Sequence, residues 1–163
     1  MSDKTEYGLK QIYFYLTKGC NLACRHCWMA PKFQTKKIIY PVLKLDLFRS
    51  IIEQAKLLGL SGVKLTGGEP LMHPEIDDIL EHIQLENLRL TVETNGLLCT
   101  PGLAEKIVKC KKPFVSVSLD AANANIHEWI RGVEGSFEDA KEGIRNLVKA
   151  GIKPQIILSV MRC

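Results

Sequence analysis

The sequence predicts an α/β fold built on a parallel sheet, mainly because two hydrophobic periods alternate along the chain. Five short apolar runs of strand length are separated by segments in which apolar residues repeat at three- and four-residue spacing. The length of 163 residues is that of one domain. Such an alternation favours right-handed crossovers between parallel strands, in either an open doubly wound sheet or part of a barrel.

The five strand-like runs follow one another at regular intervals. The first, 12–16, is rich in aromatic residues, and the second, 63–65, lies between glycine-containing turns. The third, 88–92, alternates apolar and polar residues and stops at an Asn-Gly pair. The fourth, 114–119, follows a proline, and the fifth, 155–160, contains three successive aliphatic residues.

Helical periods fill the intervals, and most of them have a start or stop signal. Pro74 fits a first helical position, Thr100 fits an N-cap, and Ser136 with Asp139 matches a capping box. The predicted buried stripes are Leu47, Ile51, Ala55 and Leu58; Ile76, Ile79, Leu80 and Ile83; Leu103, Ile107 and Val108; and Ile144, Leu147 and Val148. Ligands of parallel sheets gather at the carboxyl ends of the strands, so a site is expected in the loops that follow the strands.

The composition is that of a globular protein, with 46% hydrophobic and 25% charged residues. No apolar run approaches the ~20 residues that span a bilayer, and a net charge of +4 without a basic stripe indicates no nucleic-acid partner. The first ten residues lack the pattern of a secretory signal, so a cytoplasmic protein is expected. Because Cys163 follows the fifth strand directly, we expect the chain to be part of a longer protein.

Three of the six cysteines, Cys20, Cys24 and Cys27, fall within eight residues after the first predicted strand. Thiolate ligands at this spacing favour zinc or an iron–sulfur centre. Closed zinc sites and simple [4Fe–4S] clusters take four protein ligands, and His26, Cys99 or Cys110 can supply a fourth. In the alternative interpretation, the fourth position stays open for an exogenous ligand. Three unrelated buried thiols are the remaining interpretation.

A second motif, Gly67-Gly68-Glu69-Pro70, directly follows the second predicted strand. The glycines allow a close backbone approach to a ligand, and Glu69 adds an acceptor-only carboxylate suited to an ammonium group. Taken alone, the tetrapeptide is typical of an ordinary turn. A neighbouring cysteine triad favours a binding site instead.

Together the two motifs resemble those of the radical S-adenosylmethionine (radical SAM) superfamily. Its signature is CxxxCxΦC, in which His26 occupies the aromatic-type position, followed by a Gly-Gly-Glu-Pro-like stretch after the second strand. The resemblance runs from about residue 11 to residue 160. It implies a partial parallel (β/α)6-type barrel, here truncated after the fifth strand, with residues 1–163 as an incomplete core domain. It also implies a [4Fe–4S] cluster bound by Cys20, Cys24 and Cys27, with one iron open to SAM.

The resemblance further implies a set of residues around SAM. The residues expected to hold its amino group are Thr66, Gly67, Gly68 and Glu69, and Pro70, which stiffens the exit of this turn, is counted with the cofactor-binding residues. The backbone around His26 and Trp28 is expected near adenine. Thr94 and Asn95 are expected to touch the cofactor, although an Asn-Gly turn is the simpler interpretation.

Residues after the fourth strand complete this set. Ser118-Leu-Asp120 looks like a segment that contacts ribose or the methionine carboxylate, and Arg131 resembles an arginine that pairs with that carboxylate. The alternatives are a small sheet residue for Ser118, a helix cap for Asp120 and a solvated helix-end charge for Arg131.

By resemblance, the cluster reductively cleaves SAM to a 5′-deoxyadenosyl radical that abstracts hydrogen from a substrate. The motifs are similar to those of peptide-maturing (SPASM-type) and molybdenum-cofactor-synthesis branches. A peptide or protein substrate is expected first, a small-molecule cofactor precursor second, and activation of a glycyl-radical enzyme third. The implied partners are an electron donor such as flavodoxin or ferredoxin, with neither nucleic acid nor membrane. A non-enzymatic iron–sulfur or zinc-binding module is the hypothesis from another class.

Overall fold

The computed structural model of the chain describes residues 8–30, 32–35 and 37–161, so Cys163 lies outside the described residues. The elements, in order, are β1 (Gln11–Tyr15), α1 (Leu45–Leu57), β2 (Gly62–Thr66), the 3-10 helix η1 (Pro70–Met72), α2 (Ile76–Leu85), β3 (Arg89–Thr94), α3 (Pro101–Lys109), β4 (Lys111–Ser118), α4 (Ala124–Arg131), α5 (Ser136–Lys149) and β5 (Gln155–Ile157). All five predicted strands form. Within the described ranges, no helix is long and apolar enough to cross a membrane.

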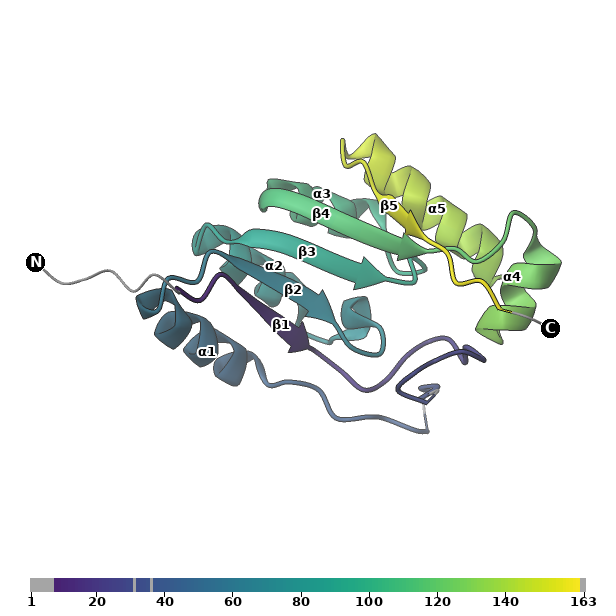
Figure 1. Ribbon diagram of the computed structural model, residues 1–163, viewed down its shortest axis with the longest axis horizontal. Helices are drawn as coiled ribbons and strands as arrows, with labels where there is room; N and C mark the ends of the chain where they lie inside the picture. Colours follow the sequence, from purple (N-terminus) through teal and green to yellow (C-terminus); the bar gives the residue numbers. More distant parts are fainter. Residues whose placement is uncertain (1–7, 31, 36, 162–163) are drawn as a thin grey trace, which may run out of the picture.

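The five strands form one parallel sheet in chain order, β1-β2-β3-β4-β5. A doubly wound sheet reverses its strand order at a switch point, which places its first strand inside the sheet. Here β1 lies at an edge, so the sheet is the open wall of a partial barrel. In Figure 1 the five arrows point to the same side, where the loop after β1 and helix α4 also lie.

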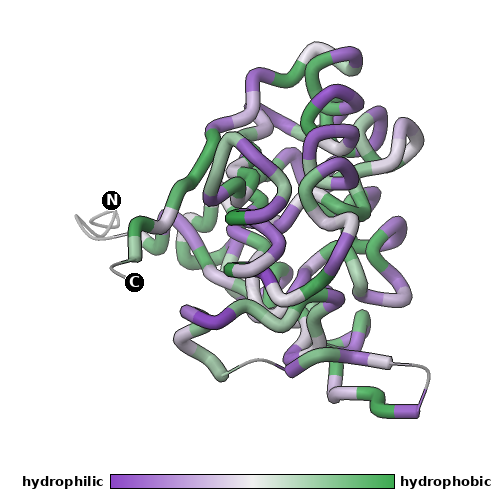
Figure 2. The backbone as a smooth tube through the Cα atoms, turned by 90° about the vertical axis from the view of Figure 1, so that its right-hand side faces the viewer, coloured by the Kyte–Doolittle hydropathy of each residue, from purple (hydrophilic) through white to green (hydrophobic). Residues whose placement is uncertain are grey.

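One hydrophobic core lies between the sheet and helices α1, α2, α3 and α5. Leu65, Val92 and Val117 face these helices and are fully buried, as is Phe48 of α1. Figure 2 shows hydrophilic and hydrophobic segments alternating along the helical turns, as expected for helices with one buried face. Each large apolar side chain buried in this layer contributes about 1.5–3 kcal/mol to folding.

The opposite face of the sheet, which is the inner face of the partial barrel, is polar and partly exposed. Tyr13 and Tyr15 of β1 are 56% and 51% exposed. Tyr13 pairs in register with Lys64, and Tyr15 pairs with Thr66. Lys64 Nζ lies 4.7 Å from the centre of the Tyr13 ring and 2.5 Å from Glu93 Oε1. This face therefore presents aromatic rings beside a pair of opposite charges.

The predicted stripe of α1 is half right, since Ala55 is buried and Ile51 packs against the core. Leu47 and Leu58 are 51% and 65% exposed, and the helix buries Leu45, Phe48, Ile52 and Ala55. Both sets of residues have helical spacing, because this segment carries apolar residues around most of its circumference. Contact with the sheet selects the stripe that contains Phe48, whose ring centroid lies 4.5 Å from that of Phe14.

The buried stripes predicted for the other helices agree better with the structure, although not every predicted residue is buried. All four predicted residues of α2 are buried, namely Ile76, Ile79, Leu80 and Ile83. Ile107 of α3 and Leu147 of α5 are buried as predicted. Val108 and Val148 are exposed, because each lies beside the buried stripe of its helix rather than on it.

Helix starts were predicted with mixed success. Thr100 caps α3 and accepts a hydrogen bond from Leu103 N at 3.3 Å, as expected. Helix α2 begins at Ile76, so Pro74 precedes the helix instead of opening it. Gly135, with φ of 80°, is the N-cap of α5, and Ser136 donates from its hydroxyl to Val133 O instead of capping.

Candidate functional site

A pocket of about 200 Å³ lies at the carboxyl edge of the sheet, among the segments that follow β1, β2, β3 and β4. Its lining residues are Lys18, Cys20, Leu22, Cys24, His26, Cys27, Trp28, Met29, Ala30, Lys32, Thr66, Gly67, Gly68, Glu69, Glu93, Thr94, Asn95, Ser118 and Arg131. The structure therefore brings together all three cysteines of the triad and most of the residues predicted around a cofactor. Pro70 and Asp120 do not line it.

The cysteine loop, residues 17–30, is irregular but tied to elements far away in the sequence. Ala23 N donates to Arg131 O at 3.0 Å, and Arg25 N donates to Ile130 O at 2.9 Å, which docks the loop on the end of α4. Gly132 has a φ of 72°, and a Cβ there would lie 2.6 Å from Ala23 O. This glycine therefore permits both the left-handed end of α4 and the close approach of the loop.

The three thiols are half-buried and form no disulfide, and the environments of Cys20 and Cys24 favour the protonated form in the absence of metal. Burial raises the pKa of Cys20 to about 12, with further contributions from the charges of Glu69 and Cys24. Burial also raises the pKa of Cys24, against the opposing effect of the Arg131 guanidinium. A metal centre must displace these protons, because the thiolate is the ligand.

Hydrogen-bond donors already surround two of the sulfur atoms. Leu22 N donates to Cys20 Sγ at 3.4 Å, Asn95 Nδ2 donates to the same sulfur at 3.8 Å, and Arg131 Nη1 donates to Cys24 Sγ at 3.5 Å. Donors of this kind are typical of iron–sulfur sites, where they stabilise thiolate charge. The donor set therefore fits a cluster held by three cysteines.

A single zinc ion fits less well. Tetrahedral Zn–S bonds of about 2.3 Å bring ligand sulfurs to within about 3.8 Å of one another. Across the described residues, no three His, Cys, Asp or Glu side chains are grouped so that they could hold one metal ion. His26 lines the pocket without forming such a group, and Cys99 and Cys110 are buried in the hydrophobic core and do not line the pocket.

The Gly67-Gly68 pair brings the end of β2 against the start of the cysteine loop. Gly67 has a φ of 128°, and Gly68 N donates to Thr17 O at 2.8 Å. A Cβ on Gly68 would lie 2.0 Å from Gly19 O. In the protein alone, these glycines thus permit a close approach between two segments of backbone, in addition to lining the pocket.

Glu69 is almost completely buried and joins β2 to β3. Its Oε1 accepts hydrogen bonds from Thr94 Oγ1 at 2.7 Å and Leu71 N at 3.0 Å, and its Oε2 accepts one from Asn95 N at 2.8 Å. Burial raises its pKa to about 7, despite these stabilising donors. A carboxylate has about four lone-pair positions, so room for one further donor remains.

Thr94 and Asn95 both line the pocket, and the expected turn is also present. Gly96 has a φ of 88°, and Leu97 N donates to Asn95 Oδ1 at 3.1 Å. The Asn95 amide donates to Asn21 Oδ1 at 2.7 Å, in addition to its contact with Cys20 Sγ. Asn95 therefore links the end of β3 to the cysteine loop.

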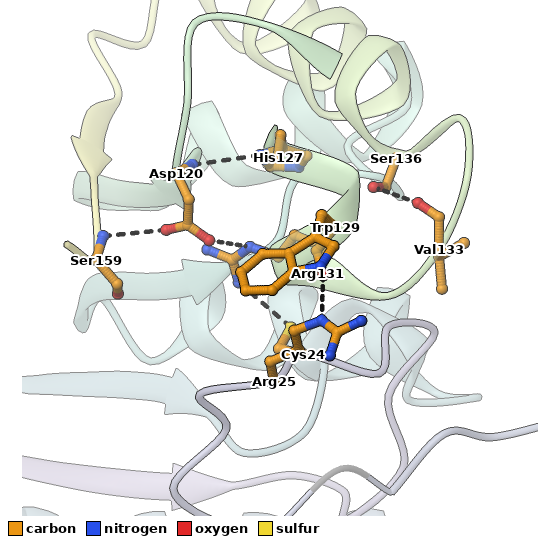
Figure 3. A network of polar contacts seen from close by, with 9 residues as sticks. All are labelled: Cys24, Arg25, Asp120, His127, Trp129, Arg131, Val133, Ser136 and Ser159. Atoms are coloured by element: carbon orange, nitrogen blue, oxygen red, sulfur yellow. Dashed lines mark hydrogen bonds and ion pairs between the residues drawn. The ribbon is translucent and has the colours of Figure 1, made fainter. Parts of the chain in front are cut away.

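Ser118, Asp120 and Arg131 lie at the ends of β4 and α4 in different roles. Ser118 and Arg131 line the pocket, whereas Asp120 lies behind Arg131 and pairs with its Nε at 2.7 Å (Figure 3). Asp120 does not cap α4, because Asn123 accepts the hydrogen bond from Ile126 N at 3.0 Å. Arg131 is only 7% exposed, so it is not a solvated helix-end charge.

Six lining residues were not identified from the sequence: Lys18, Leu22, Met29, Ala30, Lys32 and Glu93. Glu93 had a detectable signal, because it lies near the end of a predicted strand on the face opposite Val92. It accepts a hydrogen bond from Thr66 Oγ1 at 3.1 Å. The others lie on or next to the irregular cysteine loop, where no periodicity predicts which side chains face inward.

Comparison with known proteins gives a family and several relatives. The family described as "Radical SAM superfamily" matches residues 14–162. The AdoMet-dependent heme synthase of Methanosarcina barkeri is 36% identical over 151 residues, which are 93% of this chain and 42% of the relative. The antilisterial bacteriocin subtilosin biosynthesis protein AlbA of Bacillus subtilis is 30% identical over 148 residues, 90% of this chain and 32% of the relative. The chain thus spans less than half the length of these relatives.

Solved structures share the fold at lower identity. Streptococcus suis SuiB bound to the precursor peptide SuiA has a TM-score of 0.75 and 23% identity, over 92% of this chain and 32% of that chain. Native anSMEcpe with bound AdoMet has a TM-score of 0.72 and 20% identity, over 92% of this chain and 43% of that chain. The partial barrel is therefore a fold that this chain shares with larger proteins.

Proposed function

The chain belongs to the radical SAM superfamily, and on this premise we propose that residues 1–163 contribute the core domain of a radical SAM enzyme. Enzymes of this family use a [4Fe–4S] cluster and SAM, which we assign to the pocket at the carboxyl edge. When bound, this pair supplies reductive cleavage of SAM and removal of a hydrogen atom from a substrate. The proposal depends on one observation: three half-buried cysteines and the Gly67–Glu69 stretch line one pocket.

In this proposal Cys20, Cys24 and Cys27 hold the cluster and leave one iron without a protein ligand. The donors to Cys20 and Cys24 support this assignment, because they stabilise thiolates in a partly buried setting. The remaining lining residues form the walls that exclude water from the reacting groups. A small electron carrier such as flavodoxin or ferredoxin supplies the electron, and the reducing cytoplasm is the proposed compartment.

The chain's own residues provide complementary groups for the polar ends of SAM. Glu69 has a free acceptor position for the ammonium group, with Thr66, Gly67 and Gly68 beside it. Ser118 is assigned to the ribose, and the unused donors of Arg131 to the carboxylate.

Adenine and the remaining predicted contacts complete the assignment. The backbone near His26 and Trp28 is assigned to adenine, and Trp28 lies 6.3 Å from the Tyr15 ring, measured between centroids. Thr94 and Asn95 act through Glu69 and Cys20. Pro70, which starts η1 outside the pocket lining, is assigned to shaping the Glu69 turn.

Replacement of one proposed ligand tests the assignment directly. We expect Cys24→Ala to lose the brown visible absorbance and the iron content after anaerobic reconstitution, because two thiolates hold the cluster poorly. Cys110→Ala is the matched control, since Cys110 is buried in the core away from the pocket and its loss should leave the cluster in place. A Cys24→Ala protein with full iron and a spectrum that still responds to SAM contradicts the proposal.

For the substrate, a peptide or protein is the first candidate. The relative AlbA is described as a bacteriocin biosynthesis protein, and SuiB has been solved with a precursor peptide. The inner face of the partial barrel adds exposed aromatic rings, Tyr13 and Tyr15, next to the Lys64–Glu93 ion pair. Such a surface offers both apolar contacts and hydrogen bonds to a large substrate.

A cofactor precursor is the second candidate, and one observation favours it. The AdoMet-dependent heme synthase of Methanosarcina barkeri is 36% identical to this chain, higher than the 30% of AlbA. The discriminating measurement is the rate of 5′-deoxyadenosine formation by the reconstituted full-length protein. Stimulation by a porphyrin precursor of heme supports the cofactor precursor, whereas stimulation by a precursor peptide supports the peptide.

A further inference from the structure

We propose that Arg131, aimed by Asp120, raises the reduction potential of the cluster through a charged hydrogen bond to the Cys24 sulfur. Asp120 is then a positioning residue, whose direct charge effect at Cys24 is smaller than that of Arg131. The inference rests on the proposed function, because it assumes that Cys24 is a cluster ligand. It assigns to Arg131 a role in addition to contact with the SAM carboxylate.

The three groups lie in series, as Figure 3 shows. Asp120 Oδ2 is 2.7 Å from Arg131 Nε, and Arg131 Nη1 donates to Cys24 Sγ at 3.5 Å. The carboxylate thus contacts one end of the guanidinium and the sulfur contacts the other. A planar guanidinium has a fixed fork of donors, so an anchor at Nε determines where Nη1 points.

Asp120, which anchors Arg131, is itself held by two hydrogen bonds. Asp120 Oδ1 accepts a hydrogen bond from Ser159 N at 3.0 Å, and Asp120 N donates to His127 Nδ1 at 3.2 Å. The side chain of Asp120 has no exposed surface, and that of Arg131 is 8% exposed. The Arg131 carbonyl also accepts from Ala23 N, so the backbone of Arg131 is bound to the same loop as its side chain.

This arrangement singles out Cys24 among the three proposed ligands. In the part of the chain that the structure describes, the donors to Cys20 are the neutral groups Leu22 N and Asn95 Nδ2. Cys24 instead receives a donor with a permanent positive charge. The cluster environment is therefore electrostatically asymmetric.

The sign of the effect follows from charge. Reduction adds one negative charge to the cluster, so a nearby cation stabilises the reduced form more than the oxidised form. Net charge and hydrogen bonds to the sulfurs are among the features that set cluster potentials. Because Arg131 is buried, solvent and salt screen its charge weakly. Loss of Arg131 must therefore make the midpoint potential more negative.

The experiment is a redox titration of the reconstituted full-length protein without SAM, followed by the electron paramagnetic resonance signal of the reduced cluster. We expect Arg131→Met to retain its iron content and to titrate at a more negative potential than the wild type. Lys18→Met is the charge-matched control, because Lys18 lines the same pocket without a hydrogen bond to the cysteines among the described contacts. Its shift should be the smaller of the two. Equal potentials for Arg131→Met and wild type overturn the inference.

Asp120→Asn tests positioning separately and applies even where Arg131→Met fails to assemble a cluster. If Asp120 acted only as a negative charge, its neutralisation would move the potential in the positive direction. An amide offers one acceptor oxygen in place of the two that face Arg131 and Ser159, and it carries no charge, so the guanidinium loses its ionic anchor in either orientation of the amide. Positioning therefore predicts a more negative potential, and an unchanged or more positive potential overturns it.

The double variant, Asp120→Asn with Arg131→Met, completes a double-mutant cycle. If Asp120 acts mainly through Arg131, Asp120→Asn adds no further negative shift once Arg131 is already Met. An additional negative shift of similar size contradicts the serial arrangement. Failure of the proposed function has a different signature, since the wild type itself would then assemble no SAM-responsive cluster.

Discussion

The two sides of the pocket differ in how completely the polypeptide itself specifies them. On one side, the buried carboxylate of Glu69 accepts three hydrogen bonds of 2.7–3.0 Å from Leu71, Thr94 and Asn95. On the other side, the hydrogen bonds of the half-buried Cys20 and Cys24 thiols, among the described residues, are 3.4–3.9 Å long. The carboxylate side is thus fixed by strand ends, and the thiol side by a loop docked on α4.

This difference indicates how each side becomes functional. The Glu69 side is preorganised before any ligand arrives, since its donors belong to η1 and the end of β3. In the proposed function the cysteine side is completed by metal, because the raised pKa values of Cys20 and Cys24 keep these two thiols protonated until a metal displaces the protons. We call the contact between the Gly67-Gly68 pair and the start of the cysteine loop the junction of the two sides. Substitutions at the junction, then on the carboxylate side, then on the thiol side should have effects of decreasing size on the free energy of unfolding.

The largest effect is expected at the junction of the two sides. Gly68→Ala places a Cβ 2.0 Å from Gly19 O, so the backbone of one segment must move. We expect a loss of about 3 kcal/mol in the free energy of unfolding, at the upper end of the usual cost of overpacking. Urea unfolding of the metal-free protein measures it.

Gly102→Ala is the control for Gly68→Ala. Gly102 lies in α3, and an added Cβ would have no described neighbour within 4 Å, so alanine should stabilise the helix by up to about 1 kcal/mol. Similar urea midpoints for the two variants would show that the junction tolerates separation of its segments.

The pH dependence of the free energy of unfolding tests the carboxylate side of the pocket. The pKa of Glu69 is about 7 in the folded protein against an ordinary value of 4.5, so between these values the folded state holds a proton that the unfolded state has lost. Stability therefore falls as the pH rises from 4.5 through 7, by about 2–3 kcal/mol in total. Unfolding of the metal-free protein at several pH values measures this slope.

Glu69→Gln should remove that part of the slope. The difference between the two proteins isolates Glu69, because groups such as His127, whose pKa burial lowers, contribute equally to both. Parallel curves for wild type and Glu69→Gln would mean that Glu69 ionises normally in the folded protein.

The smallest effect is expected on the thiol side. Arg25 Nε donates to Trp129 O at 2.7 Å, and its guanidinium lies 4.4 Å from the centre of the Trp129 ring, which fastens the cysteine loop to α4 (Figure 3). We expect Arg25→Met to lower the free energy of unfolding by about 1 kcal/mol. It should also speed the loss of iron to a chelator.

Arg145→Met serves as the control for Arg25→Met. Arg145 pairs with Glu142 on the exposed face of α5, where such pairs contribute about 0.5 kcal/mol or less. Its iron loss should match that of the wild type. Equal chelation rates for the two variants contradict the role of Arg25 in holding the loop.

The sequence alone predicts the five strands and the location of the site, because periodicity and strand-end loops carry that information locally. It fails where a long-range contact decides between local options. The helical periods of α1 fit both Leu47 and Phe48, and only packing against Phe14 selects Phe48. Asp120 has the same limitation: a carboxylate after a strand suits a cap, a ligand contact or an ion pair, and Arg131 decides the outcome.

Motif residues were easier to place than the rest of the pocket. Cysteine and glycine carry unusual chemistry or backbone freedom, so Cys20 and Gly67 stand out in the sequence. Lys18 and Lys32 line the same pocket, yet nothing distinguishes them from lysines on the surface.

The backbone hydrogen bonds that join the cysteine loop to α4 also limit how the chain can vary in length. Ala23 N donates to Arg131 O, and Arg25 N donates to Ile130 O. An extra residue between positions 20 and 27 would therefore shift these donors out of hydrogen-bonding register with their acceptors. The segment that follows is tied to the same loop, because Cys20 N donates to Lys32 O at 3.0 Å, Gln34 N to Cys20 O at 2.8 Å and Lys18 N to Pro41 O at 3.3 Å. The length of the loop is therefore constrained from both of its neighbours.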